Sequence, residues 1–338
     1  WRTITPVIGL SPWTISAIHA LVRQCLHLYP PLCFYWKGRM QALPSAVHVL
    51  EERMRQGTVT RHRRYDIYWP STTTTITNGT TTTDDAIDTS NTTTTTSTTA
   101  TTAVSLPQAV LILPGFGISH VAYSEVASRL ADAGILAVVL SMEPLRFAHR
   151  HLGADVVSLT RIMQRIQGGK DPAYEWHLLG HSAGALAAMH LYQQFHLQPP
   201  PTNPTIHVRK LILWGCAALI TMGTDLSKLF APNDPVSILL VQATDDKLLE
   251  MTKEWQPQFQ QFFPPLQTQT EWIQGGTHHG FASYEPTWVG SPNVPTAISY
   301  SQQQQEACHK TIAFLQKSSS SSTCTANHNN DTTQEDTG

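Results

Sequence analysis

The sequence predicts an α/β protein with a doubly wound, mostly parallel sheet, helices on both faces of the sheet, and a small or absent lid. Short apolar runs without polar alternation recur along the chain, which is typical of strands covered on both faces. Stretches of helical periodicity separate these runs, and this βαβα rhythm indicates a parallel sheet. The segment from Gly215 to Asp234, which separates two predicted strands, has room for a flap but not for a cap domain.

Each predicted strand is a short run rich in apolar or β-branched residues and bounded by turn residues. The predicted strands are Thr58–Trp69, Ala109–Leu113, Ile135–Leu140, Trp176–Leu179, Lys210–Trp214, Ser237–Val241 and Thr268–Ile273. Each predicted helix carries apolar residues at helical spacing, and two of them stop at Gly134 and Gly168, which suit a helix C-cap. The predicted helices are Tyr123–Ala133, Ala154–Gln167, Ser182–Phe195, Lys247–Phe262 and Ser301–Leu315.

Composition excludes several classes of function. The chain has 338 residues, a net charge of −2 and 14% charged residues. This balance argues against nucleic acid as a partner, because phosphate binding requires a basic excess. The five cysteines are too sparse for a disulfide scaffold and form no C-x-x-C pair. The H-x-x-x-H pair of His177 and His181 lies in strand-like sequence rather than on the helix that zinc spacing needs. We therefore expect no metal and no cofactor.

Residues 1–57 are predicted to form a separate helical or targeting-like segment. No Asp or Glu precedes Glu51, and Thr3–Val22 carries no charge, although prolines and polar residues dilute its apolar side chains. Three alternatives stay open: an amphipathic helix attached to the domain, a targeting remnant, or a membrane anchor. The acid-poor character favours an intracellular or organellar location, and any membrane association would run through this segment.

Two low-complexity segments flank or interrupt the main domain, which is predicted to span residues 58–316. Ser71–Ser105 contains 19 Thr among its 35 residues and lacks the apolar side chains that would offset its ordering entropy. We expect a disordered surface insertion there, since loop-closure entropy grows only slowly with length. Residues 317–338 have a similar polar composition and are predicted to be a disordered tail.

The segment Gly180-His-Ser-Ala-Gly184 carries the most information about chemistry. It is a G-x-S-x-G sequence between a predicted strand and a predicted helix, the context in which a serine occupies a sharp, strained turn. The residues beside such a turn must be small, and Gly180 and Gly184 meet that demand. The helix that follows favours negative charge at its N-terminus. Ser182 is therefore the candidate nucleophile.

A serine nucleophile needs a base and a carboxylate that orients the base, and in this architecture the acid and then the histidine follow the serine in the chain. One predicted strand runs into Asp245-Asp246, and the next runs into His278-His279. Both turns lie at carboxyl ends of strands, where ligands bind in open α/β sheets. The order is therefore Ser182, then Asp246 or Asp245, then His278 or His279. Glu143 is an alternative acid.

An oxyanion hole would complete this site. The turn after the strand Ala109–Leu113 contains Gly115 and Gly117, which let the backbone approach a ligand, and the N–H of Phe116 is the expected donor there. Its partner would be the N–H of Ala183. Other side chains are assigned simpler roles: Cys216 as a buried apolar residue, His181 as a packing or hydrogen-bonding group beneath the turn, and His177 as part of its strand. The remaining histidines considered are expected at the surface or on helix faces: His120, His149, His151, His190 and His196.

Taken together, these segments resemble the α/β-hydrolase superfamily, and within it the small, lidless fold-5 branch akin to dienelactone hydrolases. The resemblance runs from about Leu106 to Leu315. It is carried by Leu113-Pro-Gly115, Ala122-Tyr123, Gly180-His-Ser-Ala-Gly184, Leu213-Trp214, Ala243-Thr-Asp-Asp246 and Gly275-Gly-Thr-His278, with Phe281 and Tyr284 beyond. It implies that His278 and Asp246 are the catalytic histidine and acid. The Thr-rich insertion, the tail and His279 depart from the family pattern.

The expected function is that of a serine hydrolase that acts on a small-molecule carboxylic ester or related acyl bond through an acyl-enzyme. The alternatives are an acyltransferase or thioesterase on the same triad, or a catalytically silent hydrolase-like binding protein. The sequence does not select a substrate. Several large apolar side chains either line an acyl pocket or pack under loops: Met222, Leu229, Phe230, Phe281, Tyr284 and Trp288.

Overall fold

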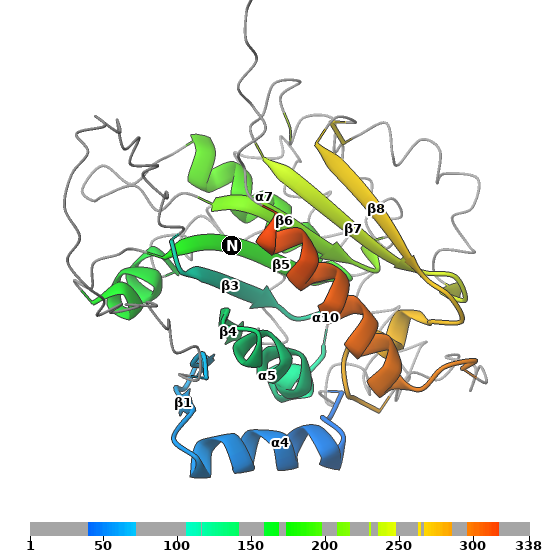
Figure 1. Cartoon of the computed structure of the whole chain (residues 1–338), viewed down its shortest axis with the longest axis horizontal. Helices are drawn as coiled ribbons and strands as arrows, with labels where there is room; N and C mark the ends of the chain where they lie inside the picture. The colour runs from blue at the N-terminus through cyan, green and yellow to red at the C-terminus, as the bar shows by residue number, and fades with distance from the viewer. Residues whose placement is uncertain are drawn as a thin grey trace, which may run out of the picture.

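The computed structural model describes residues 40–71, 106–115, 117–141, 159–168, 174–197, 208–216, 230, 236–247, 263–264, 267–285 and 296–317. They form one eight-stranded sheet in the order β1-β2-β4-β3-β5-β6-β7-β8 (Figure 1). The strands from β4 to β8 in this order run parallel, whereas β1 and β2 pair antiparallel. Their bounds are β1 Val59–Arg61, β2 Tyr65–Tyr68, β3 Gln108–Leu113, β4 Leu136–Leu140, β5 Glu175–His181, β6 Val208–Trp214, β7 Ser237–Ala243 and β8 Thr268–Ile273.

The helices pack on both faces of this sheet, as the sequence predicts. They are α4 Pro44–Arg55, the 3₁₀ helix η1 His120–Tyr123, α5 Ser124–Asp132, a helix at 159–167, α7 Ala183–Leu197, the 3₁₀ helix η5 His278–Phe281, and α10 Tyr300–Gln316. The doubly wound, mostly parallel fold class is therefore confirmed. The predicted helix at 247–262 lies outside the described residues, apart from its first position.

Alternate side chains of the buried strands face two separate cores. Leu111 of β3 packs with residues of α7 and of the helix at 159–167. Its neighbour Ile112 packs with residues of α4, α5 and α10 on the opposite face. This is the two-residue period of a strand buried on both sides, and each such side chain contributes about 1.5–3 kcal/mol relative to exposure. Figure 1 shows α5 and α10 in front of the sheet and α7 behind it.

One predicted strand is wrong in its extent. Thr58–Trp69 is predicted as one segment, but it forms the antiparallel hairpin of β1 and β2, with a turn in which the N–H of His62 donates to Tyr65 O at 2.9 Å. The physical reason is the polar run His62-Arg-Arg64, which favours a turn at the surface over a buried strand. The hairpin then extends the edge of the sheet beside β4.

Helix α4 belongs to the predicted N-terminal segment and packs against the rest of the molecule. Leu50 of α4 is buried in the core with residues of α5. The N–H of Met40 donates to Gly117 O at 2.9 Å, and the N–H of Leu43 donates to Ser283 O at 2.8 Å. Residues 1–39, 72–105 and 318–338 lie outside the described residues, so the domain boundaries stay predictions. Within the described ranges, no helix combines the length and the apolar character needed to cross a membrane.

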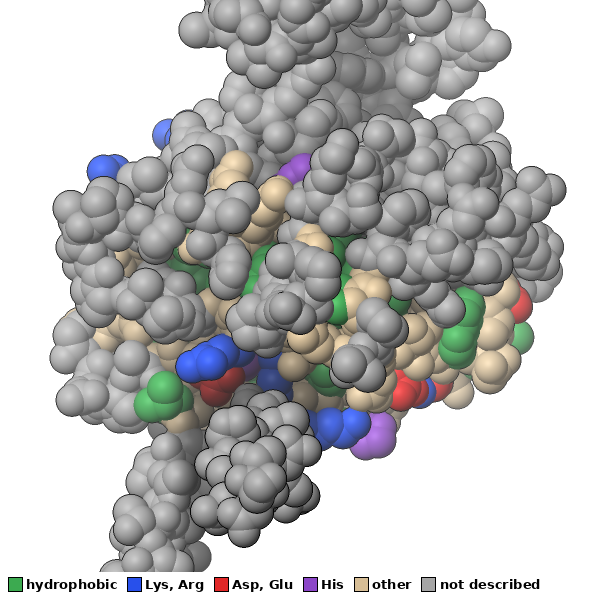
Figure 2. Space-filling view, turned by 90° about the horizontal axis from the view of Figure 1, so that it is seen from above, with side chains coloured by type: hydrophobic (Ala, Val, Ile, Leu, Met, Phe, Trp, Pro, Cys, Tyr) green, Lys and Arg blue, Asp and Glu red, His purple; other side chains and the backbone are tan. Residues whose placement is uncertain are grey.

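Ion pairs join helices to their neighbours on the surface. Arg53 of α4 pairs with Asp132 of α5, and Lys310 of α10 pairs with Glu271 of β8 at 3.0 Å. In the space-filling view, Lys and Arg side chains lie close to Asp and Glu side chains (Figure 2). Such exposed pairs contribute at most about 1 kcal/mol each, so apolar burial provides most of the stability of these helix contacts.

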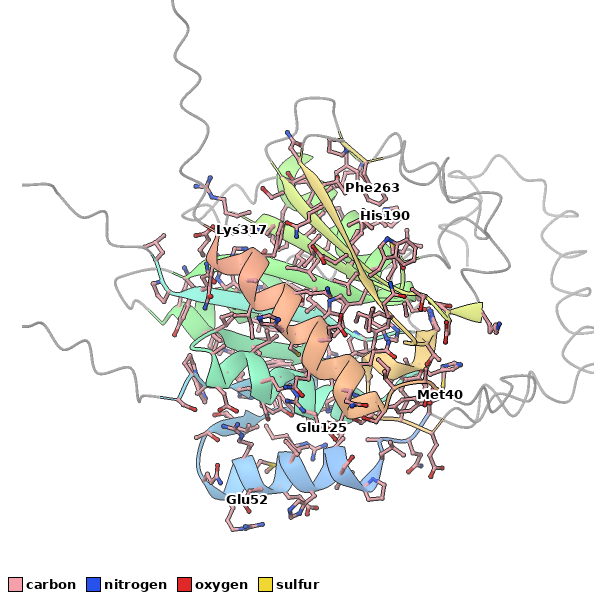
Figure 3. All side chains as sticks on the ribbon, turned by 45° about the vertical axis from the view of Figure 1, so that its right-hand side comes forward. Met40, Glu52, Glu125, His190, Phe263 and Lys317 are labelled. Atoms are coloured by element: carbon pink, nitrogen blue, oxygen red, sulfur yellow. The ribbon has the colours of Figure 1, made fainter. Side chains whose placement is uncertain are left out.

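Helix α10 crosses one face of the sheet, from the carboxyl ends of the strands to their amino ends. Its first turn is fixed by a capping box between Ser299 and Gln302. At its carboxyl end, Lys210 Nζ donates to the carbonyls of Phe314, Leu315 and Lys317 at 3.1, 2.8 and 2.9 Å. Figure 3 shows the helix lying across the strands, with Lys317 at this end. The carboxyl ends of β3, β5, β6, β7 and β8 share the other edge, where the candidate residues gather.

Candidate active site

Ser182 occupies a sharp turn between β5 and α7. Its φ is 55°, and among the residues that the structure describes it is the non-glycine residue with positive φ. This left-handed conformation is strained for a residue with a Cβ. Two backbone bonds hold it: the N–H of Ser182 donates to Trp214 O, and the N–H of Ala185 donates to Ser182 O, both at 2.9 Å. The turn therefore projects the hydroxyl group at the carboxyl edge of the sheet.

The two glycines of the motif are required by backbone packing. A Cβ on Gly180 would lie 2.3 Å from the carbonyl oxygen of Gly184. A Cβ on Gly184 would lie 2.0 Å from the carbonyl oxygen of Leu113. Because these contacts are with backbone atoms, a rotamer change cannot relieve them. The spacing G-x-S-x-G thus follows from the close approach of β3, β5 and α7 around the turn.

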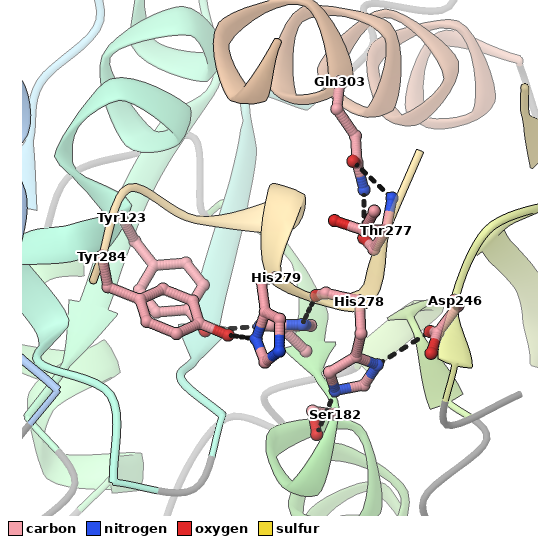
Figure 4. A network of polar contacts seen from close by, with 9 residues as sticks. Tyr123, Ser182, Asp246, Thr277, His278, His279, Tyr284 and Gln303 are labelled. Atoms are coloured by element: carbon pink, nitrogen blue, oxygen red, sulfur yellow. Dashed lines mark hydrogen bonds and ion pairs between the residues drawn. The ribbon is translucent and has the colours of Figure 1, made fainter. Parts of the chain in front are cut away.

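The loops after β7 and β8 bring a carboxylate and an imidazole to the serine. His278 Nε2 lies 2.9 Å from Ser182 Oγ, and His278 Nδ1 lies 2.8 Å from Asp246 Oδ2 (Figure 4). The Asp246 side chain is fully buried and that of His278 is 7% exposed. A low-dielectric surrounding strengthens both contacts. This arrangement can draw the hydroxyl proton towards the ring while the carboxylate fixes the orientation of the ring.

His279 and Asp245, the chain neighbours of His278 and Asp246, contact other residues. His279 Nδ1 lies 2.6 Å from the Tyr284 hydroxyl, and burial lowers the pKa of His279 to about 4. Asp245 accepts a hydrogen bond from the Thr244 hydroxyl at 3.2 Å. Of the two adjacent pairs that the sequence leaves open, the structure therefore places Asp246 and His278 in line with Ser182.

The loop that carries His278 is braced from α10. The N–H of Thr277 donates to Gln303 Oε1 at 2.9 Å, and Gln303 Nε2 donates to Thr277 O at 2.7 Å (Figure 4). Gln303 is 1% exposed. A Cβ on Gly280 would lie 1.9 Å from Gln303 Oε1, so a larger residue there would displace the Gln303 amide from its two bonds to Thr277.

A second connection links the acid and base loops. The N–H of Gly275 donates to Thr244 Oγ1 at 2.8 Å, and the N–H of Asp245 donates to Gly276 O at 2.9 Å. The two loops are thus held together by groups that flank Asp246 and His278. Sequence reasoning missed both Gln303 and Thr244. A polar residue on the buried face of an amphipathic helix is the signal that would have found Gln303.

Of the two predicted oxyanion donors, the structure describes the N–H of Ala183. Ala183 is the first residue of α7, so its N–H has no acceptor within the helix and lies at the positive end of the helix dipole. Phe116 lies outside the described residues, as does the alternative acid Glu143. The N–H of the adjacent Gly115 donates to the Tyr123 hydroxyl at 2.9 Å.

Other predicted side chains have mainly packing roles. Cys216 is buried, and burial raises the pKa of its thiol well above the ordinary value, which keeps the thiol protonated. Phe281 stacks on Trp214 with ring centroids 5.6 Å apart. Phe230 contacts Phe263 in the core on the α7 face. Met222, Leu229 and Trp288 lie outside the described residues, so the acyl pocket stays a prediction.

The remaining histidines differ in environment. His120 is largely buried, with 12% of its side chain exposed, and its Nε2 lies 3.2 Å from the buried Asp66 carboxylate. Its place on the 3₁₀ helix η1 agrees with the expectation of a position at the surface or on a helix face. His190 of α7, labelled in Figure 3, is half-buried. His149 and His151 lie outside the described residues, and the side chain of His196 is not described. Within the described ranges, no three His, Cys, Asp or Glu side chains cluster as a metal site.

Comparisons with known proteins give similarities of fold. No family model matches the chain, and no curated protein matches its sequence. Dienelactone hydrolase from Anabaena variabilis is 15% identical with a TM-score of 0.40, over 72% of this chain and 88% of that chain. Est1E from Butyrivibrio proteoclasticus is 14% identical with a TM-score of 0.40, over 62% and 89%. A cold-adapted esterase from an Arctic intertidal metagenomic library is 16% identical with a TM-score of 0.40, over 62% and 82%.

Identities of 14–16% and TM-scores of 0.40 carry neither a family nor an activity to this chain. The fold class rests instead on the strand order and on the strand–turn–helix at Ser182. That element, at the carboxyl edge of a mostly parallel sheet, has the geometry of a nucleophile elbow. The chain therefore has the α/β-hydrolase fold.

Proposed function

We propose that the protein is a serine hydrolase that cleaves a carboxylic ester or a related acyl bond. In this proposal Ser182 is the nucleophile, His278 the general base and Asp246 the orienting carboxylate. The observation that carries it is the continuous chain of contacts from Ser182 Oγ through His278 to Asp246, at 2.9 and 2.8 Å. The motifs that resemble the fold-5, dienelactone-hydrolase-like branch support the same assignment.

The first half of the reaction forms an acyl-enzyme. His278 Nε2 takes the hydroxyl proton as Ser182 Oγ attacks the carbonyl carbon of the substrate. The N–H groups of Ala183 and Phe116 would stabilise the oxyanion of the tetrahedral intermediate. When the intermediate collapses, the bond to the leaving group breaks and His278 gives its proton to the leaving alcohol. Asp246 stays ionised and accepts the Nδ1–H throughout.

The second half regenerates the serine. A water molecule loses a proton to His278 and attacks the acyl carbon. When the second tetrahedral intermediate collapses, the bond between the acyl carbon and Ser182 Oγ breaks, the carboxylic acid is released and His278 returns the proton to Ser182 Oγ. An alcohol or thiol in place of water would give acyl transfer by the same steps. Product analysis by mass spectrometry with added alcohol and thiol acceptors distinguishes hydrolysis from transfer.

The test measures turnover of p-nitrophenyl acetate and butyrate and labelling by a fluorophosphonate probe. Ser182→Ala should abolish both, and His278→Ala and Asp246→Asn should lower kcat by roughly 10⁴-fold or more. Two neighbours provide matched controls: His279→Ala and Asp245→Asn should keep kcat within about tenfold of the wild type, because neither lies in the chain of contacts.

Circular dichroism of each variant would establish that it is folded. Equal turnover by folded Ser182→Ala and wild type would refute the proposal. A wild-type protein that neither turns over the esters nor reacts with the probe would instead support a catalytically silent binding protein.

A further inference from the structure

A buried chain of hydrogen bonds connects three segments of the site from beneath. The N–H of Gly115 donates to Tyr123 Oη at 2.9 Å, and Tyr123 Oη lies 2.7 Å from His181 Nδ1. On its other side, His181 Nε2 lies 3.1 Å from the carbonyl oxygen of His278. Both Tyr123 and His181 are 0% exposed. Figure 4 shows Tyr123 on the far side of the His278 loop from Asp246.

Elementary chemistry fixes the proton positions in this chain. A carbonyl oxygen only accepts hydrogen bonds, so His181 Nε2 must carry a proton. Burial lowers the pKa of His181 well below its ordinary value, so the ring is neutral and Nδ1 is an acceptor. The Tyr123 hydroxyl must therefore donate to Nδ1 and accept from Gly115, and burial raises its pKa so that it keeps its proton. Every donor in the chain has an acceptor, and the chain carries no charge.

The neutrality of His181 matters for the ring beside it. The His181 and His278 ring centroids are 5.2 Å apart. A cation at this distance would oppose the transfer of the serine proton to His278. A neutral donor provides the hydrogen bond without that repulsion.

We propose that Tyr123 and His181 are positioning residues for the reaction. They hold the turn after β3 and the loop of His278 at a fixed separation around Ser182. Gly115 is next to Phe116, whose N–H is the expected oxyanion donor, and His181 is next to Ser182 in the chain. The segments that bear the donor, the nucleophile and the base are thus joined by one chain of contacts. This inference rests on the proposed function and assigns two further residues to it.

The variant that tests this chain of hydrogen bonds most directly is Tyr123→Phe, which removes one hydroxyl and keeps the ring. It leaves the Gly115 N–H and His181 Nδ1 without their partner and frees the β3 turn and the His278 loop to shift. Misplacement of reacting groups by about 1 Å costs up to roughly 100-fold. We expect kcat on p-nitrophenyl butyrate to fall by about 10- to 100-fold while KM changes less than about threefold.

Three further variants sharpen the test. His181→Leu removes both contacts, whereas His181→Gln keeps an amide N–H for the His278 carbonyl and should restore part of the kcat lost in His181→Leu. Tyr68→Phe is the matched control, because Tyr68 is buried in the same core and its hydroxyl donates to Ser124 Oγ at 2.9 Å, a bond that includes none of Gly115, Tyr123, His181 and His278. It should unfold at a similar temperature to Tyr123→Phe and keep the wild-type kcat.

The outcomes separate this inference from the function on which it rests. Wild-type turnover that depends on Ser182, with kcat unchanged in folded Tyr123→Phe and His181→Leu, would overturn the positioning role and leave the hydrolase proposal intact. Absence of Ser182-dependent turnover in the wild type would overturn both. If Tyr123→Phe does not fold, the comparison of His181→Leu with His181→Gln decides: equal kcat in the two refutes the positioning role, and partial rescue supports it.

Discussion

His177 makes the stability of the fold depend on pH in a predictable way. It lies in β5, paired in register with Lys210 of β6, and is 0% exposed. Among the described residues, neither of its ring nitrogens has a hydrogen-bond partner. Burial, with a smaller contribution from the positive charge of Lys210, lowers the pKa of His177 to about 3. The folded protein therefore holds this ring neutral at pH values where the unfolded chain binds a proton.

The sign and size of the effect follow from linkage. Above about pH 6.5 the ring is neutral in both states and contributes nothing to the pH dependence. As pH falls from about 6.5 towards 3, the unfolded state takes up a proton that the folded state does not, so stability is lost at about 1.4 kcal/mol per pH unit. Between pH 7 and pH 5 the loss from His177 alone is about 2 kcal/mol. Below about pH 3 the loss levels off.

Urea unfolding of the wild type and of His177→Leu at pH 7, 6 and 5 tests this value. The free energy of unfolding of the wild type should fall by about 2 kcal/mol more than that of the variant across this range. Burial also lowers the pKa of His181 and His279, but both are present in each protein, so their contributions cancel. The same pH dependence in both proteins would refute the assignment of a neutral, unpartnered His177.

Three other predictions concern packing and hydrogen bonds, two of them at the site and one at the opposite ends of the strands. Gly184→Ala places a Cβ 2.0 Å from a backbone oxygen, so it should prevent folding or lower the free energy of unfolding in urea by more than about 4 kcal/mol. Gly57→Ala is the control. Gly57 has φ of 71° and no atom within 4 Å of the added Cβ, so the loss there should be only about 1–2 kcal/mol. Gln303→Leu removes both bonds to the loop of His278 and should lower stability by about 1–3 kcal/mol and kcat by at least roughly tenfold; an unchanged kcat would contradict the bracing role. Lys210→Met removes the donor to the last carbonyls of α10 and should lower the free energy of unfolding by about 2–3 kcal/mol with kcat preserved, because it lies at the edge opposite the site; a large loss of kcat would show that the two edges are coupled.

The parts of the fold that depend on short-range pattern could be predicted from the sequence. The strands β3, β4, β6 and β7 each contain a continuous apolar run, and their burial on both faces is visible in that pattern. The turn at Ser182 was predictable because two glycines at fixed spacing reveal the close approach of three segments. The hairpin of β1 and β2 was not recognised, since its strands are short and its polar turn does not contain glycine or proline.

Contacts between distant segments could not be predicted in the same way. Adjacent residues such as Asp245 and Asp246, or His278 and His279, differ only in which side of a loop they occupy, and that is set by packing from α10 and by the bonds between the two loops. Gln303 and Tyr123 contact partners far away in the sequence. Local pattern can mark Gln303 as a polar residue on the buried face of a helix, but it cannot identify the loop that Gln303 contacts, and it gives no sign of the contact between Tyr123 and His181.

The bracing of the His278 loop by α10 also has a consequence for biosynthesis. Gln303 is more than a hundred positions beyond Ser182, so the ribosome synthesises the turn of Ser182 long before the helix that braces the loop of His278. A nascent chain that ended at η5 would contain Ser182, Asp246 and His278 and would still lack the helix that braces the loop of His278. Under the proposed function, Ser182 would therefore become catalytically active only once α10 has been translated, well after the strands around it have been made.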